Sequence, residues 1–542
     1  MYRAVASVFA ALAISGCAVS GTETFPQVAA PIPAAEVQPQ QHLWWFDAHG
    51  ATQDARAVLA VLHDARSHGL NPEDYRATAL SQAVEQIMSE GLPPAIPGTP
   101  AGDRLAALDA DLTGAVLRYL SDLHNGRLSP EVLSHRFKAP PSQSFDARAY
   151  LDRARQAGRL GQAVQASTPK FPMYEALRGV MNAYRAMGDH PAWQLTLPEP
   201  KSRSIKPGQP YDALEVLAAR LIALGDLSEL VDQGQSAAAP GVYEGELVEG
   251  VRRFQARHGL ETDGVIGAAT LAELNVTPAE RVEQMALTLE RLRWTPTLYG
   301  PRMIAINVPE FILRAYEQKD GKIELNMEMR VVVGRALNTQ TPIFLEDMRF
   351  IEFSPYWNVP PSIARGETLP KLRRDPAYFD QQGFEFVTRD GKVISQFSEE
   401  GLAKVRAGEW RIRQRPGPRN ALGDIKFIFP NDQNIYLHHT PTPALFARAR
   451  RDFSHGCIRI EEPVELAQFV LRNNAAWSKD RIEAAMRAGK SSTLRLDEPI
   501  PVLIAYSTAV VKRDGKVYFF PDIYRQDSRL KQALQSARPL HS

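Results

Sequence analysis

The spacing of apolar residues divides the chain into a mostly helical part and a later part built of short strands. Over residues 42–205 apolar positions recur every three or four residues, and breaks containing Gly and Pro separate the periodic segments. The pattern predicts a helical scaffold domain with helices at Ala55–Leu62, Leu105–Leu120 and Tyr174–Met187. Trp44 and Trp45 suit either buried packing, the more frequent fate of such residues, or a sugar platform.

A second, smaller helical pattern occupies residues 211–275, after a proline-rich boundary. Apolar positions at helical spacing run through Leu214–Leu224 and Val248–His258. Asp263-Gly264 then supplies a tight turn, after which Ala268–Leu274 resumes a helix. We therefore expect a small three-helix module.

After a predicted helix at Pro278–Trp294, the spacing of apolar residues changes from the helical period to the two-residue period of strands. Short apolar or alternating runs bounded by Gly, Asn, Asp and Pro predict strands at Met303–Val308, Met329–Val333, Phe350–Phe353, Phe427–Phe429, Val502–Tyr506 and Val517–Phe520. Asp514-Gly515 predicts a type I′ hairpin turn between the last two strands. Residues 276–542 thus read as a mainly β domain, with one helix at Pro463–Asn473.

One segment interrupts this β pattern. Residues 355–415 hold helix-capable pieces broken by prolines, followed by extended residues, which predicts an insertion that protrudes from the β core. Such an insertion is a candidate lid over a site. The expected fold class is multi-domain α+β: a helical scaffold domain, a three-helix module and a mainly β domain with an inserted capping subdomain.

The beginning of the chain predicts export. Residues 1–16 hold one positive charge at Arg3 and an apolar run too short to span a bilayer permanently, as in a signal peptide. The ending Ile-Ser-Gly-Cys17 resembles a lipobox, whose cysteine becomes the acylated first residue of a bacterial lipoprotein. An ordinary signal peptide with an incidental cysteine is the alternative. Residues 17–41, rich in Pro, Ala and Gln, predict a solvated tether.

Length and charge narrow the possible functions. The 542 residues exceed what one hydrophobic core organises, so several domains are expected. With 63 Lys and Arg against 62 Asp and Glu, interspersed along the chain, the sequence lacks the basic surplus of a nucleic-acid-binding protein. The two cysteines exclude a disulfide framework, because one of them lies in the export signal.

The second cysteine, Cys457, lies in the most chemically specific segment, Ser454–Glu462, which reads SHGCIRIEE. A thiol with an ordinary pKa is only a few per cent thiolate at neutral pH, so nucleophilic chemistry needs a nearby imidazole or an electropositive pocket. His455 is one candidate base. His438, 19 residues before the cysteine at the end of another predicted strand, is the favoured candidate, since catalytic groups usually assemble from distant segments.

The neighbours of Cys457 suggest supporting roles. Gly456 allows the backbone of His455, Gly456 and Cys457 to turn sharply and direct amides toward one point, as an oxyanion hole requires. Arg459 could attract a substrate carboxylate or pair with Glu461 or Glu462.

The same histidines and cysteine could also suggest a zinc site. Adjacent His438 and His439 on a strand point to opposite faces, so at most one would normally reach a common ion. We expect no metal and no other cofactor.

This constellation resembles the L,D-transpeptidase catalytic domain, also called the YkuD domain. The residues that match the family motif are His438, Ser454, His455, Gly456, Cys457, Ile458 and Arg459. The resemblance implies that Cys457 is the nucleophile, that His438 is the base and that the backbone carbonyl of His439 orients it. Most members have a smaller residue than His439, so which imidazole acts remains open at this point.

Residues 251–275, VRRFQARHGLETDGVIGAATLAELN, resemble the peptidoglycan-binding domain of cell-wall hydrolases. Bacterial cell wall is the implied ligand; a copy that only buttresses its neighbours is the alternative. Phe254 and Gln255 could equally be fold markers or ligand contacts. The order of the segments resembles the large YcbB-like L,D-transpeptidases.

That resemblance implies a reaction in peptidoglycan. The thiolate attacks a tetrapeptide donor stem, releases D-alanine and forms a thioester, and a diaminopimelate amine of an acceptor stem completes a 3→3 cross-link. The resemblance also implies carbapenems as inhibitors. The lipobox resemblance, with Ala18 after Cys17, implies a lipid anchor in the outer membrane, so we expect a location in the cell envelope that faces the periplasm. The alternatives are a non-catalytic wall-binding lipoprotein scaffold, or the same thioester passed to water, a D-amino acid or a lipoprotein lysine.

Overall fold

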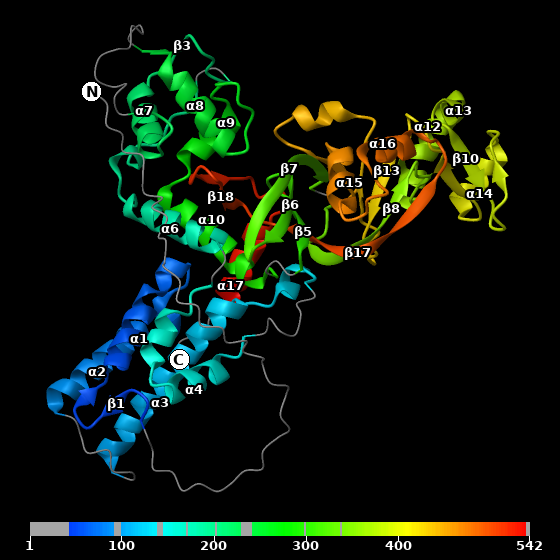
Figure 1. Ribbon diagram of the computed structural model, residues 1–542. Helices are drawn as coiled ribbons and strands as arrows, with labels where there is room; N and C mark the ends of the chain where they lie inside the picture. The colour runs from blue at the N-terminus through cyan, green and yellow to red at the C-terminus, as the bar shows by residue number, and fades with distance from the viewer. Residues whose placement is uncertain are drawn as a thin grey trace, which may run out of the picture. The chain divides into compact units, whose positions relative to one another are not determined.

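A computed structural model describes most of the chain, and Figure 1 shows the order of its helices and strands. The described residues are 43–91, 99–137, 145–169, 172–200, 203–228, 241–296, 300–336 and 339–537. The predicted signal peptide, the predicted tether and Cys17 lie outside them. Within these ranges no helix has the length and apolar character needed to cross a membrane.

Helices dominate the first part of the described chain, as its apolar periodicity predicts. They are α1 (Gln53–His63), α2 (Ala77–Glu90), α3 (Pro100–Asn125), α4 (Ala147–Gln156), α5 (Leu160–Gln165) and α6 (Pro172–Ala186), with 3₁₀ turns at Asp64–His68, Pro72–Tyr75, Pro130–Leu133 and Pro191–Trp193. A two-residue pairing of β1 (Phe46–Asp47) with β2 (Gly50–Ala51) precedes them. Their apolar stripes meet in one buried core.

The tryptophan pair takes part in this core. Trp45 is fully buried, and its indole nitrogen donates to Thr113 Oγ1 at 2.9 Å. The backbone amides of Trp44 and Trp45 both donate to Asp109 Oδ1 at 2.8 Å. The packing prediction is therefore confirmed for Trp45. A sugar platform made by the pair is wrong, because an enclosed ring offers no face to a ligand.

The predicted three-helix module consists of α7 (Leu214–Ala223), α8 (Glu246–Arg257) and α9 (Ala268–Asn275), with a short pairing of β3 (Gln209–Pro210) and β4 (Val242–Tyr243). Gln255 is buried, accepts from the Gly264 amide at 2.8 Å and donates to the Val265 carbonyl at 3.0 Å. Phe254 lies in the module's core. Both side chains therefore hold the turn and the helices together rather than facing a ligand.

Helix α10 (Pro278–Trp294) begins with a reciprocal capping box between Thr277 and Glu280 and leads into the mainly β region. Its large sheet consists of β5 (Arg302–Asn307), β6 (Ile312–Lys319), β7 (Lys322–Gly334), β8 (Phe344–Phe353), β13 (Ile425–Ile428), β14 (Leu437–His438), β15 (Asp452–Ser454), β16 (Ile458–Ile460) and β17 (Ser492–Ala505). The strand order is β15-β7-β16-β14-β13-β8-β17-β5-β6, and β6 also pairs with β7. This last pairing returns the sheet to itself around a buried apolar core.

Helices α15 (Pro463–Leu471) and α16 (Lys479–Arg487) close that core with side chains such as Leu466, Phe469 and Ile482. After β17 the chain forms the hairpin β18 (Ala509–Val511) and β19 (Val517–Phe519) and ends in α17 (Gln526–Ser536).

The hairpin corrects two details of the sequence prediction. The partner of Val517–Phe519 is Ala509–Val511, whereas Val502–Ala505 pairs with β5 and β8 inside the large sheet. The apolar side of the hairpin joins the core of the helical region, which explains why it leaves the sheet. Of the two turn residues only Gly515 has a positive φ, +74°, so the turn is not type I′, which requires two.

Residues 355–415 form a compact unit of their own, called the insertion below. Its strands pair in the order β11 (Val393–Ile394), β10 (Phe384–Val387), β12 (Arg411–Gln414) and β9 (Trp357–Asn358). Its helices are α11 (Pro361–Ile363), a π-helical turn at Ala364–Thr368, α12 (Leu369–Arg374), α13 (Ala377–Gln381) and α14 (Glu399–Ala407). These elements share a separate apolar core, and Figure 1 shows α12, α13, α14 and β10 grouped together.

Candidate active site

The backbone brings the predicted nucleophile and base onto adjacent strands. β14 and β16 run parallel, with Leu437 opposite Ile458 and His438 opposite Arg459. Leu437 and Ile458 point into the core. Since side chains alternate between the faces of a strand, His438 and Arg459 lie on the opposite face, where Cys457 precedes β16.

A row of polar side chains crosses the sheet on this face. Glu352 on β8 is paired in register with Lys426 on β13, and Lys426 with His438 on β14. Tyr436 lies two residues before His438, and the two rings meet edge to face with centroids 5.8 Å apart. The Lys426 ammonium lies 4.0 Å from the Tyr436 ring centroid and 3.8 Å from Glu352. The Cys457 environment is therefore electropositive, with one nearby carboxylate.

His438 is held as a neutral imidazole. Its side chain is only 4% exposed, and its Nδ1 lies 2.5 Å from the backbone carbonyl of His439. A carbonyl can only accept, so Nδ1 carries the hydrogen and Nε2 keeps its lone pair. Burial, followed by the charge of Arg459, lowers the His438 pKa to about 3.

Cys457 is the free cysteine of the described chain and is partly exposed. Its sulfur lies 3.6 Å from the Asn434 carbonyl. Burial raises the pKa of the Cys457 thiol above its ordinary value, although hydrogen bonding to Tyr436 and the charges of Lys426 and Arg459 act in the other direction. Burial and the adjacent Cys457 also raise the Tyr436 pKa. At neutral pH the resting pair is thus a thiol and a neutral imidazole, rather than a thiolate and an imidazolium.

Side-chain hydroxyls fix the loop before the cysteine. Ser454 Oγ donates to the Cys457 carbonyl at 2.5 Å and accepts from the Gly456 amide at 3.1 Å. Thr339 Oγ1 donates to the Ser454 carbonyl at 3.1 Å, and Thr341 Oγ1 to the Gly456 carbonyl at 2.7 Å. The loop is therefore held by the hydroxyl of its own Ser454 and by two threonines of a neighbouring segment.

Gly456 has a φ of +113°, a region that L side chains rarely adopt, so the turn depends on glycine. The Gly456 amide is already engaged by Ser454. In a planar trans peptide the N–H points away from the preceding carbonyl. Because the carbonyls of Ser454 and Gly456 face the threonines, the amides of His455 and Cys457 point the opposite way. These two N–H groups, rather than that of Gly456, are therefore oriented away from the loop's own hydrogen bonds and could donate to an oxyanion.

The other two histidines considered for the site, His455 and His439, bind carboxylates. His455 Nε2 lies 2.6 Å from Oε1 of Glu367, which belongs to the π-helical turn of the insertion. His439 Nδ1 lies 2.6 Å from Asp424 Oδ1. Gly423 is packed against His439, because an added Cβ would lie 2.8 Å from the His439 Cβ. The three imidazoles therefore have separate partners, and His438 is the one placed on the face of Cys457.

Arg459 lacks the internal partner that its sequence neighbours suggest. Glu461 instead binds Arg330, with Nε to Oε2 at 2.9 Å. The Arg459 Nε is buried with no hydrogen-bond partner in the described chain. Glu462 forms no hydrogen bond or ion pair with Arg459 in the described chain either, so the predicted internal pair with Glu461 or Glu462 is wrong.

The described residues contain no group of three or more His, Cys, Asp or Glu side chains arranged to hold a metal ion. His438 and His439 turn to different acceptors, as the alternation of a strand predicts.

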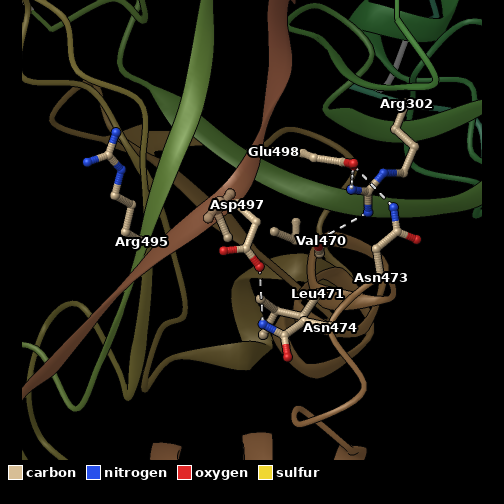
Figure 2. Close-up of a pocket in the computed structure, with 9 residues that line it drawn as sticks. Arg302, Val470, Leu471, Asn473, Asn474, Arg495, Asp497 and Glu498 are labelled. Carbon is tan, nitrogen blue, oxygen red and sulfur yellow. Dashed lines mark hydrogen bonds and ion pairs between the residues drawn. The ribbon is translucent and has the colours of Figure 1, made fainter.

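A surface pocket lies elsewhere, between the end of α15 and β17 (Figure 2). Two of its charged groups bind one another, since Arg302 lies 3.3 Å from Glu498. Glu498 also accepts from Asn473 at 3.2 Å, and Asn474 donates to Asp497 at 3.4 Å. It offers no nucleophile and no imidazole. The face of Cys457 therefore carries the stronger case for chemistry.

Several site residues were missed by sequence reasoning. These residues lie on other strands or loops, up to 116 residues before Cys457, and belong to no motif. They are Lys426, Thr341, Asp424 and Glu367. Tyr436 had a usable signal, since period-two alternation places it on the same face as His438.

Comparison with known proteins agrees with this geometry. Residues 301–491 match the family described as the L,D-transpeptidase catalytic domain (YkuD), residues 211–274 a peptidoglycan-binding domain and residues 38–181 a scaffold domain. A Haemophilus influenzae protein named as an L,D-transpeptidase is 31% identical over 264 residues, which are 49% of this chain and 51% of that protein. The match thus spans about half the length of the curated relative.

Two solved structures are similar at 14% identity. One is a fused Zn-dependent amidase/peptidase and peptidoglycan-binding protein from Clostridium acetobutylicum, with a TM-score of 0.16, covering 56% of this chain and all of that one. The other is Bd1075 of Bdellovibrio bacteriovorus, with a TM-score of 0.17, covering 44% of this chain and 56% of that one. Scores this low carry no structural argument. The chain therefore carries an L,D-transpeptidase (YkuD) catalytic domain at residues 301–491 and a peptidoglycan-binding domain at residues 211–274.

Proposed function

We propose that the protein is a cysteine-dependent L,D-transpeptidase that acts on peptidoglycan stems and forms 3→3 cross-links. The observation that carries the proposal is the neutral His438 imidazole on the strand beside Cys457, with its Nδ1 fixed by the His439 carbonyl. That arrangement leaves Nε2 free to accept a proton. We assign the nucleophile to Cys457 and the base to His438, with His439 acting through its backbone.

The first half-reaction transfers one acyl group to sulfur. As His438 Nε2 takes the thiol proton, the sulfur attacks the carbonyl carbon of the third residue of a tetrapeptide donor stem. The resulting oxyanion is stabilised by the amides of His455 and Cys457. The C–N bond then breaks, His438 returns the proton to the leaving amine, and D-alanine departs from a Cys457 thioester.

The second half-reaction regenerates the thiol. A diaminopimelate amine of the acceptor stem attacks the thioester carbonyl and loses a proton to His438. The C–S bond breaks, and the sulfur recovers that proton. Ser454, bonded to both the Gly456 amide and the Cys457 carbonyl, supports this role by keeping the loop in one conformation through both steps.

The insertion suits the role of a lid. A thioester hydrolyses if water reaches it before the amine, so a structure that covers the acyl group favours transfer. The contact of Glu367 with His455, next to the nucleophile, supports this role. We also propose the YcbB-like subtype, because the order of the segments and the insertion in the catalytic region resemble it. The proposed domains are residues 42–205, 211–275 and 276–542.

The surroundings of the enzyme follow from its substrate. A peptidoglycan-binding domain suits a location in the cell envelope, and we propose that residues 1–16 direct export and that Cys17 is acylated. Carbapenems should acylate Cys457, since they present a reactive carbonyl to the same thiol.

Incubation of purified protein with disaccharide-tetrapeptides tests the proposed function. A cross-linked dimer and released D-alanine, both lost in Cys457→Ala, are expected. D-alanine without dimer would favour hydrolysis as the reaction. No product, together with retained binding to sacculi, would favour a wall-binding scaffold instead.

A further inference from the structure

An uncompensated positive charge lies beside the proposed base. Arg459 is the register neighbour of His438, and its Nε is buried without a partner in the described part of the chain. Nearby acids do not bind it: Glu461 binds Arg330, Glu367 of the insertion binds His455, and no hydrogen bond or ion pair joins Glu462 to Arg459 in the described chain. A buried guanidinium N–H without a hydrogen-bond partner is costly to a fold. Its retention at this point suggests that a ligand supplies the missing anion.

Arg335 adds a second positive charge on the same loop system. Its backbone amide donates to the Ser454 carbonyl at 3.0 Å, and it directly follows Gly334, the strand partner of Ser454. Its side chain is exposed and makes no hydrogen bond or ion pair with the described residues. Burial, followed by the charge of Arg335, lowers the Arg459 pKa, as expected for two cations that lie close together.

The direction of proton transfer identifies which substrate group would meet these cations. The imidazole that protonates a leaving amine must lie next to that nitrogen. In the departing D-alanine the carboxylate is bonded to the carbon that bears this nitrogen. A group beside His438 therefore lies beside that carboxylate, and Arg459 is such a group. Guanidinium groups bind carboxylates with paired N–H donors.

We propose that Arg335 and Arg459 form a binding subsite for the terminal carboxylate of the donor stem, the one that leaves with D-alanine. The subsite rests on the proposed function, because it presupposes a peptide stem with its scissile bond at Cys457. It makes Arg335, which lies outside the family motif, a residue that determines donor specificity.

Binding to a protein that cannot form the thioester tests the subsite apart from turnover. In a Cys457→Ser background, calorimetry compares a disaccharide-tetrapeptide with the same stem carrying a terminal D-alanine amide. The acid should bind about 10- to 100-fold more tightly, as expected for a charge-assisted pair. Arg335→Gln should remove most of this preference and leave the affinity for the amide unchanged.

Matched variants separate recognition from folding. Arg349→Gln removes an exposed arginine of β8 that pairs with Asp347 at 3.3 Å, and it should keep the full preference. Arg459→Lys, which retains the charge, should keep part of it. Equal binding of acid and amide in the background, or an equal loss for both in Arg335→Gln, would overturn the subsite.

Failure of the proposed subsite can also be distinguished from failure of the proposed function. If the background discriminates acid from amide while the wild-type protein releases no D-alanine, Arg335 and Arg459 bind the terminal carboxylate but the transpeptidase proposal fails. If the wild type releases D-alanine and the Cys457→Ser protein binds acid and amide equally, the transpeptidase proposal stands and the subsite fails.

Discussion

At the scale of single residues, burial sets the charge state of the site. The His438 pKa is lowered to about 3 and the Cys457 pKa is raised, so the thiol and imidazole are both neutral at rest. His438 must therefore act as a general base during attack, rather than maintain a preformed thiolate. Lys426 and Arg459 moderate the cost of the negative sulfur that forms.

The role of His438 predicts a large loss on substitution. His438→Gln should reduce kcat by about 10²- to 10⁴-fold, the usual contribution of a general base, measured as D-alanine release. His455→Gln is the matched control, since that imidazole binds Glu367, and it should reduce kcat by less than about tenfold. An equal loss in both variants would contradict the assignment.

The raised thiol pKa predicts how Cys457 reacts with iodoacetamide. Burial disfavours the thiolate, so the alkylation rate should stay low through pH 7 and rise above about pH 8.5, the ordinary thiol value. Mass spectrometry of the labelled protein gives the rate at each pH. A high rate that is already constant between pH 5 and 7 would reveal a preformed thiolate instead.

Some residues of the candidate site could be predicted from the sequence, and others could not. Cys457 and His438 could be chosen from spacing and residue chemistry alone. The engagement of the Gly456 amide by Ser454 could not, because it depends on how one loop closes in space. Arg335 and Asp424 could not either, since each meets the site from a separate segment.

At the scale of elements, the insertion is joined to the motif by one carboxylate. The breakdown of strand alternation predicted the insertion, and the structure gives it a sheet and a core of its own. Its contact with His455 was not predictable, because Glu367 lies in a rare π-helical turn with no sequence signature. The hairpin of β18 and β19 shows the same limit: the turn is local, but the choice of partner strand depends on the distant helical core.

Loss of the contact between the insertion and the motif should favour hydrolysis of the thioester over its transfer to the acceptor amine. Glu367→Gln weakens its bond to His455, so the ratio of hydrolysed to cross-linked product should rise a few-fold, measured by chromatography of the muropeptides. Glu400→Gln is the control, because Glu400 lies in the same insertion and pairs with Lys404 on its own helix. An unchanged ratio in Glu367→Gln would contradict the role of the insertion as a lid.

At the scale of the whole molecule, several buried histidines are kept neutral. Burial lowers the pKa of His68 and His135 to about 3 and that of His124 to about 4. His258 is lowered well below its ordinary value, and His438 to about 3. An unfolded histidine takes up a proton near pH 6.5, whereas these folded ones do not. The folded state therefore loses stability as the pH falls from about 6.5 toward 3.

This linkage predicts acid-sensitive domains. At pH 5 each such histidine costs about 2 kcal/mol relative to pH 7.5, so the melting temperatures should fall clearly between these pH values. Calorimetry across the pH series gives the result, domain by domain. Melting temperatures that are unchanged or higher at pH 5 would contradict the neutral, buried state of these side chains.

The most direct measurement is the intact mass of the protein after brief incubation with a disaccharide-tetrapeptide. The wild type should gain the mass of the stem minus D-alanine, on Cys457, and release one D-alanine for each adduct. His438→Gln should form the adduct slowly, and Cys457→Ala not at all. Release of D-alanine by Cys457→Ala, or an adduct on another residue, would contradict the thioester mechanism.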